Sequence, residues 1–384
     1  MARFSTSSAL PADRRYRNMV YIEEACFYPP DQSCQMRSCL ALTAAVADHP
    51  LFFQPGLSTT AGWFRLWLEA FGDGCAGIWQ DQSPGSPGIP YQRVTQRIGP
   101  LHLAAAGGAA NDHTPRYDIL GELADPSPVL TRMMAGLDVS FLSFPYLSAD
   151  SKLLRAVREK PDGLLYQLDV CESAPYVDCS GGWDEYWASR GKSRTEWGRR
   201  ERRLMDDQDA RLACLTRWDE IAPVFDAILA IEASGWKGQQ GSAIAQSPQT
   251  LAFYSKAAQS WAVEDRLRLF VQYLQDRPIA FELNALSGGV LNCVKHGYLE
   301  NCAKLGPGQV LRIQVLRWAF AQPEIALFDM FGPATEAKLK WATGVEDLYT
   351  LRIFRRSAGG LLAWARLLAA PRIKAKLAAL AGKK

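Results

Sequence analysis

Apolar residues recur along this chain at two different spacings, one typical of helices and one typical of strands. The clearest helical spacing lies in the second half, where Leu311, Val315 and Trp318 recur after the Gly306-Pro307-Gly308 segment. The positions around them are also mostly apolar, which predicts a largely buried helix. Just upstream, residues 290–294 form a short apolar run of the kind that predicts a strand. The pattern therefore predicts a strand, a glycine-containing loop and a helix in succession.

The first half contains helical and strand spacings in a comparable order. A helix is expected where Trp63, Trp67 and Phe71 recur and Gly72 follows. Further helices are expected at 129–137 and 151–159, and strands at 76–80, 91–98, 101–106, 116–123, 139–147 and 163–170. Mixed elements of this kind favour an α/β layer structure.

The second half repeats that order. Helices are expected at 183–208, 218–232, 249–262 and 335–341, and strands at 210–216, 266–274, 278–285, 290–294, 325–330 and 349–354. Three consecutive strands joined by short turns predict an antiparallel meander, and the strand, helix and strand that follow predict neighbouring parallel strands. We interpret the two halves as copies of one fold, although their sequences are too different to demonstrate a repeat.

A length of 384 residues also favours more than one domain. We divide the chain into an N-terminal extension (1–55), a first domain (56–180), a second domain (181–356) and a basic amphipathic tail (357–384). Residues 39–47 could form a short helix within the extension. The tail is expected to be a surface helix, and contact with a membrane surface is an alternative.

Composition narrows the class of protein. The chain is 48% hydrophobic and 22% charged, as is ordinary for a globular protein, and its net charge of +3 is too small to indicate a nucleic-acid partner. Its nine cysteines have no CxxC spacing, which favours reduced thiols in a cytoplasmic protein and no zinc site. No apolar run approaches the ~18 residues of a membrane span.

The loop before the buried helix carries the first chemical hypothesis. A helix N-terminus offers free backbone N–H groups and the positive end of the helix dipole, which suit a pyrophosphate. The residues expected to bind it are Leu305, Gly306, Gly308, Gln309 and Val310. The alternative is a simple Gly-Pro turn.

Several motifs then resemble one family. They are Ser234-Gly235-Trp236-Lys237-Gly238 followed by Gly241-Ser242-Ala243-Ile244, then Lys295, Tyr298 and Glu300 ahead of Gly306-Pro307-Gly308, then Asp329, Gly332, Lys338 and Trp341, with the arginine-rich stretch 194–204 upstream. Together they resemble the CelD/BcsL-type acetyltransferases of the GNAT superfamily, a branch associated with cellulose and exopolysaccharide synthesis. The resemblance covers residues 183–356. Three positions depart from the family pattern, namely Gly306, Leu299 and Ala337.

The resemblance implies an α/β fold of two tandem GNAT-like acyl-CoA N-acyltransferase domains with mixed, mostly antiparallel sheets, as in FemX-like proteins. The domains would be split near residue 180 with a cleft between them, and one continuous sheet would contradict this arrangement. The implied activity is acyl transfer from acyl-CoA, acetyl or longer, to an amine or hydroxyl of a glycan, a peptide side chain or a small amine. No metal is implied, and an acyl carrier protein is an alternative donor.

Two other functions remain open at this point. One is a catalytically silent GNAT-type scaffold for polysaccharide or lipopeptide assembly, and the other is a FemX-like aminoacyl transferase. The loop at 305–309 together with Asp329 and Lys338 favours an enzyme.

Acyl transfer needs a base for the acceptor and donors for the oxyanion. The candidate bases are Asp329, Glu232, His296 and His113, and the candidate anion holders are Lys237 and Lys338. Glu232 could instead be an exposed carboxylate at a helix end, and Asp329 could cap the helix that carries Lys338. The candidate substrate-binding residues are Trp236, Tyr298, Trp341 and His113, and the two tryptophans could instead be core residues.

Overall fold

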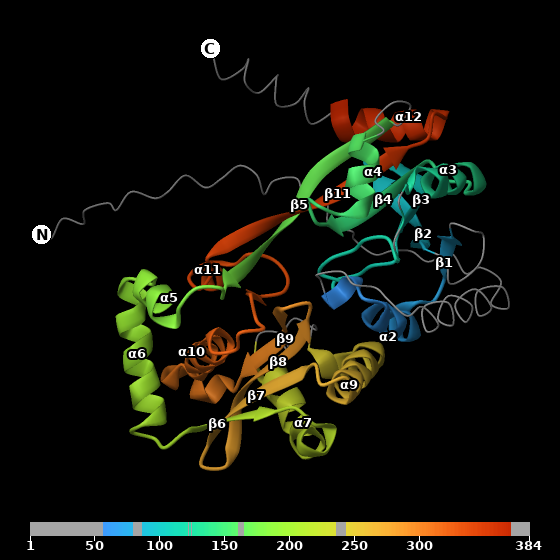
Figure 1. Cartoon of the computed structure of the whole chain (residues 1–384). Coiled ribbons are helices and arrows are strands. Elements are labelled where there is room, and N and C mark those ends of the chain that lie inside the picture. The colour runs from blue at the N-terminus through green and yellow to red at the C-terminus, as the bar shows by residue number, and fades with distance from the viewer. Residues whose placement is uncertain are drawn as a thin grey trace, which may run out of the picture.

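The computed structural model describes residues 57–79, 87–121, 123, 125–159, 165–235 and 243–369 (Figure 1). The helix expected at 39–47, the turn containing Trp236, Lys237 and Gly238, and the tail beyond residue 369 lie outside the described residues.

One large sheet runs through the described part of the chain. Its 11 strands are β1 (Cys75–Trp79), β2 (Gly88–Ile98), β3 (Leu101–Gly108), β4 (Phe141–Leu147), β5 (Leu165–Asp178), β6 (Arg211–Leu215), β7 (Leu267–Leu274), β8 (Arg277–Ser287), β9 (Val290–Tyr298), β10 (Leu327–Asp329) and β11 (Gly344–Phe354). Their order is β1-β2-β3-β4-β11-β5-β10-β9-β8-β7-β6. Neighbours are antiparallel except at β3/β4 and β9/β10, which are parallel. The expected α/β fold with a mixed, mostly antiparallel sheet is confirmed.

Each parallel pair is joined through a helix, as the repeated order predicts. Helix α3 (Ser127–Gly136) connects β3 to β4, and α10 (Pro307–Phe320) connects β9 to β10. In the first half, α4 (Lys152–Glu159) and β5 follow, and in the second half α11 (Glu336–Leu339) and β11 follow. The two halves therefore follow one plan, β–α–β–α–β, around their parallel pairs.

The last strand of each half pairs with the other half. β5 pairs with β10 of the second half, β11 pairs with β4 of the first half, and β5 and β11 pair with each other over nearly their whole length. Our expectation of a division near residue 180 into two domains, each with its own sheet, is therefore wrong. The exchanged strands are long and hydrogen-bonded on both sides, so they join the two halves into one continuous sheet (Figure 1).

Most predicted helices form within a few residues of their expected bounds. The others described are α2 (Ala61–Phe71), α5 (Trp183–Ser189), α6 (Lys192–Met205), α7 (Trp218–Ser234), α9 (Pro248–Val263) and α12 (Ala358–Trp364). The single helix expected at 183–208 is two helices, because Gly191 adopts a left-handed φ of 55° between α5 and α6. The described residues of the strand expected at 116–123 form a loop, in which Leu120 makes an isolated bridge with Gly88.

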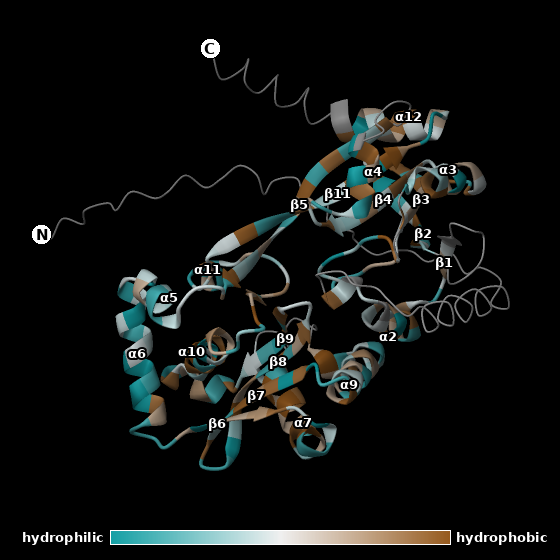
Figure 2. Cartoon of the chain, in the orientation of Figure 1, coloured by the Kyte–Doolittle hydropathy of each residue, from teal (hydrophilic) through white to brown (hydrophobic). Residues whose placement is uncertain are grey.

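The core extends across both halves of the chain. On one side of the sheet, Trp63 of α2 stacks on Trp261 of α9, with ring centroids 6.0 Å apart, so a first-half helix packs directly against a second-half helix. On the other side, α5, α6 and α10 enclose a second cluster that includes Trp197 and Leu316. Figure 2 shows that α6 is mostly hydrophilic along its length. Burial of large aromatic side chains between the halves therefore adds to the shared sheet in holding them together.

Candidate active site

The parallel strands β9 and β10 pair over only three residues each. Val290–Asn292 of β9 align with Leu327–Asp329 of β10, after which β10 ends while β9 continues to Tyr298. A short 3-10 helix, η4 (Glu300–Leu305), then leads directly into α10. The N-terminus of α10 follows the C-terminal end of β9. It therefore lies on the same side of the sheet as the C-terminal end of β10, and ligands bind at the C-terminal ends of parallel strands.

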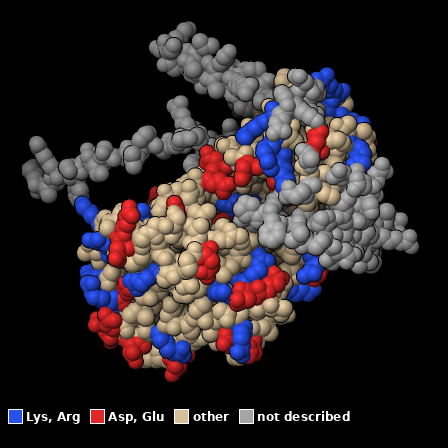
Figure 3. All heavy atoms as spheres, in the orientation of Figure 1, with Lys and Arg blue, Asp and Glu red and all other residues tan. Residues whose placement is uncertain are grey.

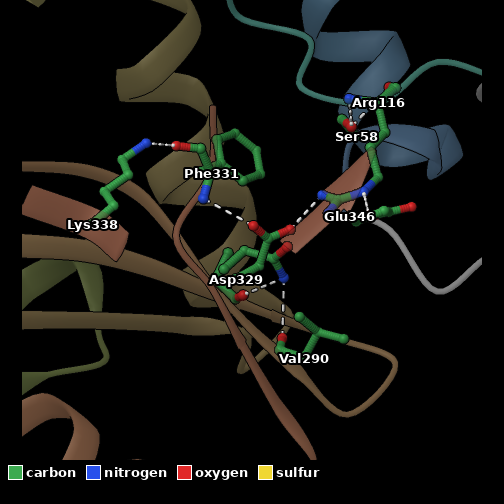
Figure 4. Close-up of polar contacts among 9 residues, drawn as sticks. Ser58, Arg116, Val290, Asp329, Phe331, Lys338 and Glu346 are labelled. Carbon is green, nitrogen blue, oxygen red and sulfur yellow. Dashed lines mark hydrogen bonds and ion pairs between the residues drawn. The ribbon is translucent and has the colours of Figure 1, made fainter. Parts of the chain in front are cut away.

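Asp329 ends β10 and is buried, with 5% of its surface exposed. Its Oδ1 accepts a 2.8 Å hydrogen bond from the N–H of Phe331, and its Oδ2 forms an ion pair with Nη1 of Arg116. Arg116 also binds Oε2 of Glu346 on β11, through Nη2 at 2.7 Å and Nε at 3.0 Å (Figure 4). One guanidinium from a first-half loop therefore joins the ends of two second-half strands.

The backbone of that loop is also held in place. Ser58 accepts from the N–H of Arg116 at 3.1 Å and donates to its carbonyl oxygen at 2.9 Å. Burial acts to lower the pKa of Arg116, but the negative charges of Asp329 and Glu346 outweigh it and raise that pKa above its ordinary value. Arg116 consequently remains charged, and Asp329 faces a permanent cation.

The segment after β10 has an unusual backbone. Phe331 has a φ of 49° and Gly332 one of 76°, so two consecutive residues are left-handed, and the first carries a bulky side chain. Lys338 on α11 stabilises this turn, since its Nζ donates to the carbonyl oxygens of Phe331 at 2.6 Å and Pro333 at 3.1 Å. Burial lowers the pKa of Lys338 to about 8. Strained backbone maintained by side chains in this way is often found at functional sites.

Glu172 on β5 is a candidate that sequence reasoning missed. It aligns with Leu348 of β11, while Glu346 aligns with Ala174, so Glu172 and Glu346 lie on the same face of this strand pair. Oε1 of Glu172 is buried, and none of the described residues forms a hydrogen bond with it. Burial raises the pKa of Glu172 to about 7, although Lys338 and Arg116 both act to lower it. A carboxyl group with this pKa can exchange a proton near neutral pH.

Glu232, an expected base, is buried, and both of its carboxylate oxygens have partners. It is 2% exposed, its Oε2 accepts from the N–H of Ile244 at 2.8 Å, and its Oε1 lies 3.7 Å from Nζ of Lys295. It is therefore not an exposed carboxylate at a helix end either, because it anchors the chain where residues 243–246 return to the core.

His113, another expected candidate, lies where the first-half loop contacts α9. Its Nδ1 is 3.1 Å from Oη of Tyr254, and its Nε2 is 3.5 Å from Oγ1 of Thr250. Burial, with a smaller contribution from the charge of Lys295, lowers the pKa of His113 to about 4. The imidazole is thus neutral near pH 7 and is committed to contacts between the halves.

The remaining candidates are scattered. His296 is exposed on β9, with Nδ1 4.0 Å from Sγ of Cys293. Trp341 is 7% exposed, and its ring stacks on that of Trp197 with centroids 3.6 Å apart, so it lies in the core. Trp236 and Lys237 lie outside the described residues. The structure therefore brings together Asp329 and Lys338 of the predicted set, and adds Glu172 and Arg116.

The N-terminus of α10 has the features expected of an anion site. Gly306 is left-handed, with a φ of 68°, and its carbonyl oxygen accepts from the N–H groups of Gln309 and Val310. Among the described residues, none accepts from the N–H of Gly308. Arg200 of α6 donates to Oε1 of Gln309, which places a guanidinium beside this helix end. A free N–H, the helix dipole and an arginine all favour a phosphate at this position.

The ring of Tyr298 lies against the same turn. A Cβ added to Gly308 would be 3.0 Å from Cδ1 of Tyr298, and one added to Gly306 would be 3.0 Å from Arg200. Tyr298 is 39% exposed, so a ligand at the helix end can reach it. Larger residues at either glycine would crowd this turn.

Two further features are absent from the described residues. No group of three or more His, Cys, Asp or Glu side chains is arranged to hold a metal ion in these segments. No helix in the same segments is long and apolar enough to cross a membrane.

Comparisons with known proteins agree with this geometry. Residues 191–339 match the family model described as an acetyltransferase (GNAT) domain, a range that includes β9, the loop, α10 and β10. No curated protein matches the sequence significantly.

Solved structures show the same fold. The chain is similar to the C-terminal domain of a proposed lysylphosphatidylglycerol synthetase from Agrobacterium fabrum, with a TM-score of 0.52 and 12% identity over 85% of this chain and 95% of that one. It is also similar to a conserved protein of unknown function from Bacteroides thetaiotaomicron, with a TM-score of 0.51 and 11% identity over 86% of this chain and 100% of that one. The crystal structure of FemX gives a TM-score of 0.49 at 8% identity, over 86% of this chain and 98% of that one. The first two show that most of the chain shares the fold of those proteins.

Proposed function

We propose that this chain is an acyltransferase that moves an acyl group from an acyl-CoA thioester to an amine or hydroxyl acceptor. The observation that carries the proposal is the N-terminus of α10, where a free N–H and Arg200 offer an anion site inside the segment that matches a GNAT domain. Beyond the C-terminal end of β10 lies the carboxyl group of Glu172, whose pKa is about 7. These two features supply donor binding and proton transfer.

The residues at the helix end would hold the pyrophosphate of the donor. Gly308 contributes its N–H, Arg200 its guanidinium and Tyr298 an aromatic face. Bound acyl-CoA would supply the thioester carbonyl that is the acyl source. Because Gly306 is left-handed and has no side chain, the backbone can approach a phosphate closely at this turn.

Glu172 acts as the proton acceptor in this proposal. As the acceptor nitrogen or oxygen attacks the thioester carbonyl, a C–N or C–O bond forms, the C–S bond breaks, and the proton of the acceptor passes to Glu172. Lys338, whose pKa is about 8, is the nearby group that can return a proton to the departing thiolate. The net reaction yields an amide or ester and a free thiol.

Asp329 has a positioning role in this scheme. Its carboxylate faces Arg116 and accepts from the N–H of Phe331, so it is poorly suited to accept a further proton. It instead fixes the turn whose carbonyl oxygens hold Lys338. The motif at Asp329 and Lys338 that resembles the CelD/BcsL type would thus serve to place the lysine.

A mass-spectrometric assay with full-length protein tests the function. Acetyl-, octanoyl- and palmitoyl-CoA are each combined with amine and sugar-hydroxyl acceptors, and products and free thiol are measured together. Acceptor-dependent thiol release with a matching product mass is expected. Calorimetry of CoA binding is run alongside. Tight CoA binding without turnover for any acceptor would favour the catalytically silent scaffold, and absence of both binding and turnover would refute the proposal.

A further inference from the structure

Helix α12 presents two leucines to solvent at one end of the molecule. Leu361 and Leu362 are 48% and 43% exposed, whereas Gly360 and Ala363 of the same helix are buried. Ala363 belongs to a small core cluster with residues of β2, β3, β4 and β11. One side of this short helix therefore packs on the sheet, and the leucines lie on the opposite side.

The contact between α12 and the sheet is too close to admit a larger side chain. A Cβ added to Gly360 would lie 2.7 Å from the carbonyl oxygen of Ser140, the residue that precedes β4. The first turn of the helix is also capped, because Oγ of Ser357 accepts from the N–H of Gly360 at 3.3 Å. The helix therefore cannot rotate to bury its leucines, and their exposure is a fixed feature of the fold.

Exposed arginines lie around this helix. Arg97, Arg356 and Arg366 form no ion pair with another described residue. Nη1 of Arg366 would be 4.0 Å from a Cβ on Gly99, and Nε of Arg97 donates to the carbonyl oxygen of Gly99 at 3.2 Å, so both lie beside the β2–β3 turn. Lys and Arg predominate among the charged side chains visible where α12 lies (Figure 3). We call the two leucines and these three arginines the α12 surface.

The sequence around α12 is strongly cationic as well. Residues 348–384 contain nine Lys and Arg and no Asp or Glu. The whole chain has a net charge of +3, so residues 1–347 carry the difference between +3 and +9, which is −6. Two of the nine cations, Arg352 and Arg355, have carboxylate partners in the fold. A charge asymmetry of this kind indicates a negatively charged partner for the C-terminal part of the chain.

We propose that the α12 surface docks on an anionic lipid bilayer. The leucines would enter the boundary between headgroups and acyl chains, and the arginines would bind lipid phosphates. Single exposed leucines are common in soluble proteins, but here two adjacent ones are combined with cations that have no carboxylate partner. The inference is independent of the proposed acyl transfer.

Two other occupants fit the α12 surface less well. Nucleic acid would bind the arginines through its phosphates but would gain little from the leucines between them. A second copy of the chain, related by a two-fold axis, would bring the same three arginines close to each other, and this repulsion opposes association. A bilayer of anionic lipids accommodates both the apolar and the cationic groups.

The test measures co-sedimentation of the full-length protein with lipid vesicles. One set of vesicles is neutral phosphatidylcholine, and the other contains about 30% phosphatidylglycerol, which supplies the negative surface charge. The variant L361S/L362S removes the exposed apolar groups. Its matched control is V263S/L339S, which replaces two side chains that are 88% and 47% exposed on α9 and α11.

A second pair of variants tests the charges. R356Q/R366Q removes two cations of the α12 surface, and R199Q/R203Q removes two exposed cations of α6, which lies far from α12 (Figure 1). Both variants lower the net charge by the same amount. A difference between them therefore reports where the charges lie and excludes an effect of total charge.

The wild type is expected to bind the anionic vesicles at least about tenfold more tightly than the neutral ones. R356Q/R366Q should weaken that binding about tenfold to thirtyfold, and L361S/L362S about tenfold. Both controls should stay within about twofold of the wild type, because neither alters the α12 surface. Raising the salt concentration from about 0.1 M to about 1 M should weaken wild-type binding, since it screens the arginines.

Four results would overturn the inference. They are equal binding to both kinds of vesicle, unchanged binding of both α12 variants, equal losses in the variants and their controls, and a wild-type dimer that L361S/L362S dissociates. Tighter binding to duplex DNA than to the anionic vesicles would likewise replace the bilayer with nucleic acid. The proposed acyl transfer is measured with soluble acceptors and no vesicles, so its success or failure is scored separately.

Discussion

Replacement of Glu172 by glutamine should separate its chemical role from its effect on stability. Glutamine keeps the shape of the side chain and cannot accept the proton. Loss of a general base typically lowers the rate about a hundredfold to ten-thousandfold. The turnover number should fall by that factor, while CoA affinity remains unchanged because the proposed phosphate site is built by the N-terminus of α10 and Glu172 belongs to β5.

The same substitution should stabilise the protein at alkaline pH. The pKa of Glu172 is raised in the fold from 4.5 to about 7, so the neutral carboxyl is the favoured form. Its contribution to stability is fully present below pH ~4.5 and is lost as the pH rises through about 7. Since each pH unit corresponds to about 1.4 kcal/mol, the loss in the wild type approaches about 3 kcal/mol at pH 8. Glutamine carries no charge and avoids this cost.

The assay is therefore a pair of measurements over pH 5 to 9. The wild-type kcat/KM should rise with pH through an apparent pKa of about 7, and this limb should be absent from the residual activity of E172Q. Melting temperatures of the two proteins should coincide near pH 5 and differ by several degrees at pH 8, with E172Q higher. An E172Q enzyme with wild-type turnover, or one destabilised at pH 8, would refute the reasoning.

Three further substitutions test other parts of the site. R116A should lower the free energy of unfolding, measured in urea, by about 3–5 kcal/mol because it leaves the Asp329 carboxylate buried without its cation. R116A/D329N should recover part of that loss. Full stability of R116A would contradict a stabilising role for the ion pair. G308D should weaken CoA binding in calorimetry, whereas G136D, at an open position of α3, should not. Equal CoA affinity in both variants would mean that the loop before α10 does not bind the phosphate. His113 has a pKa of about 4 in the fold, so it contributes stability above pH ~6.5 that is lost as the pH falls toward 4. H113Q should therefore flatten the decline in the free energy of unfolding between pH 7 and 4.5. An unchanged slope would exclude His113 as the source of that decline.

The parts of the fold set by local spacing were predictable. Helix α10 followed from Leu311, Val315 and Trp318, and the antiparallel strands β7, β8 and β9 followed from short turns between apolar runs. The exchange of β5 and β11 did not follow from any local pattern. Pairing between distant strands depends on which partner is left available once the rest of the sheet has formed.

The candidate site divides in the same way. Asp329 and Lys338 lie close together in sequence and belong to a motif, so the sequence alone could propose them. Glu172 lies in a long strand with no motif. Its pKa is raised by burial, against the opposing charges of Lys338 and Arg116, and only the fold creates this environment. The motif could not decide whether Trp341 is a core residue or lines a site, because the tryptophan that it stacks on comes from α6.

The exchange of β5 and β11 has a consequence for how the chain is made. During translation the first half, including β4, emerges from the ribosome long before β11 has been synthesised. Until then, the edge of β4 that pairs with β11 in the folded protein has no partner strand. Unpaired strand edges associate with other chains, and nascent or truncated copies ending before residue 344 would expose this one. Production of the first half alone should therefore yield aggregates, and supplying residues 344–354 as a separate peptide should reduce them by completing the edge.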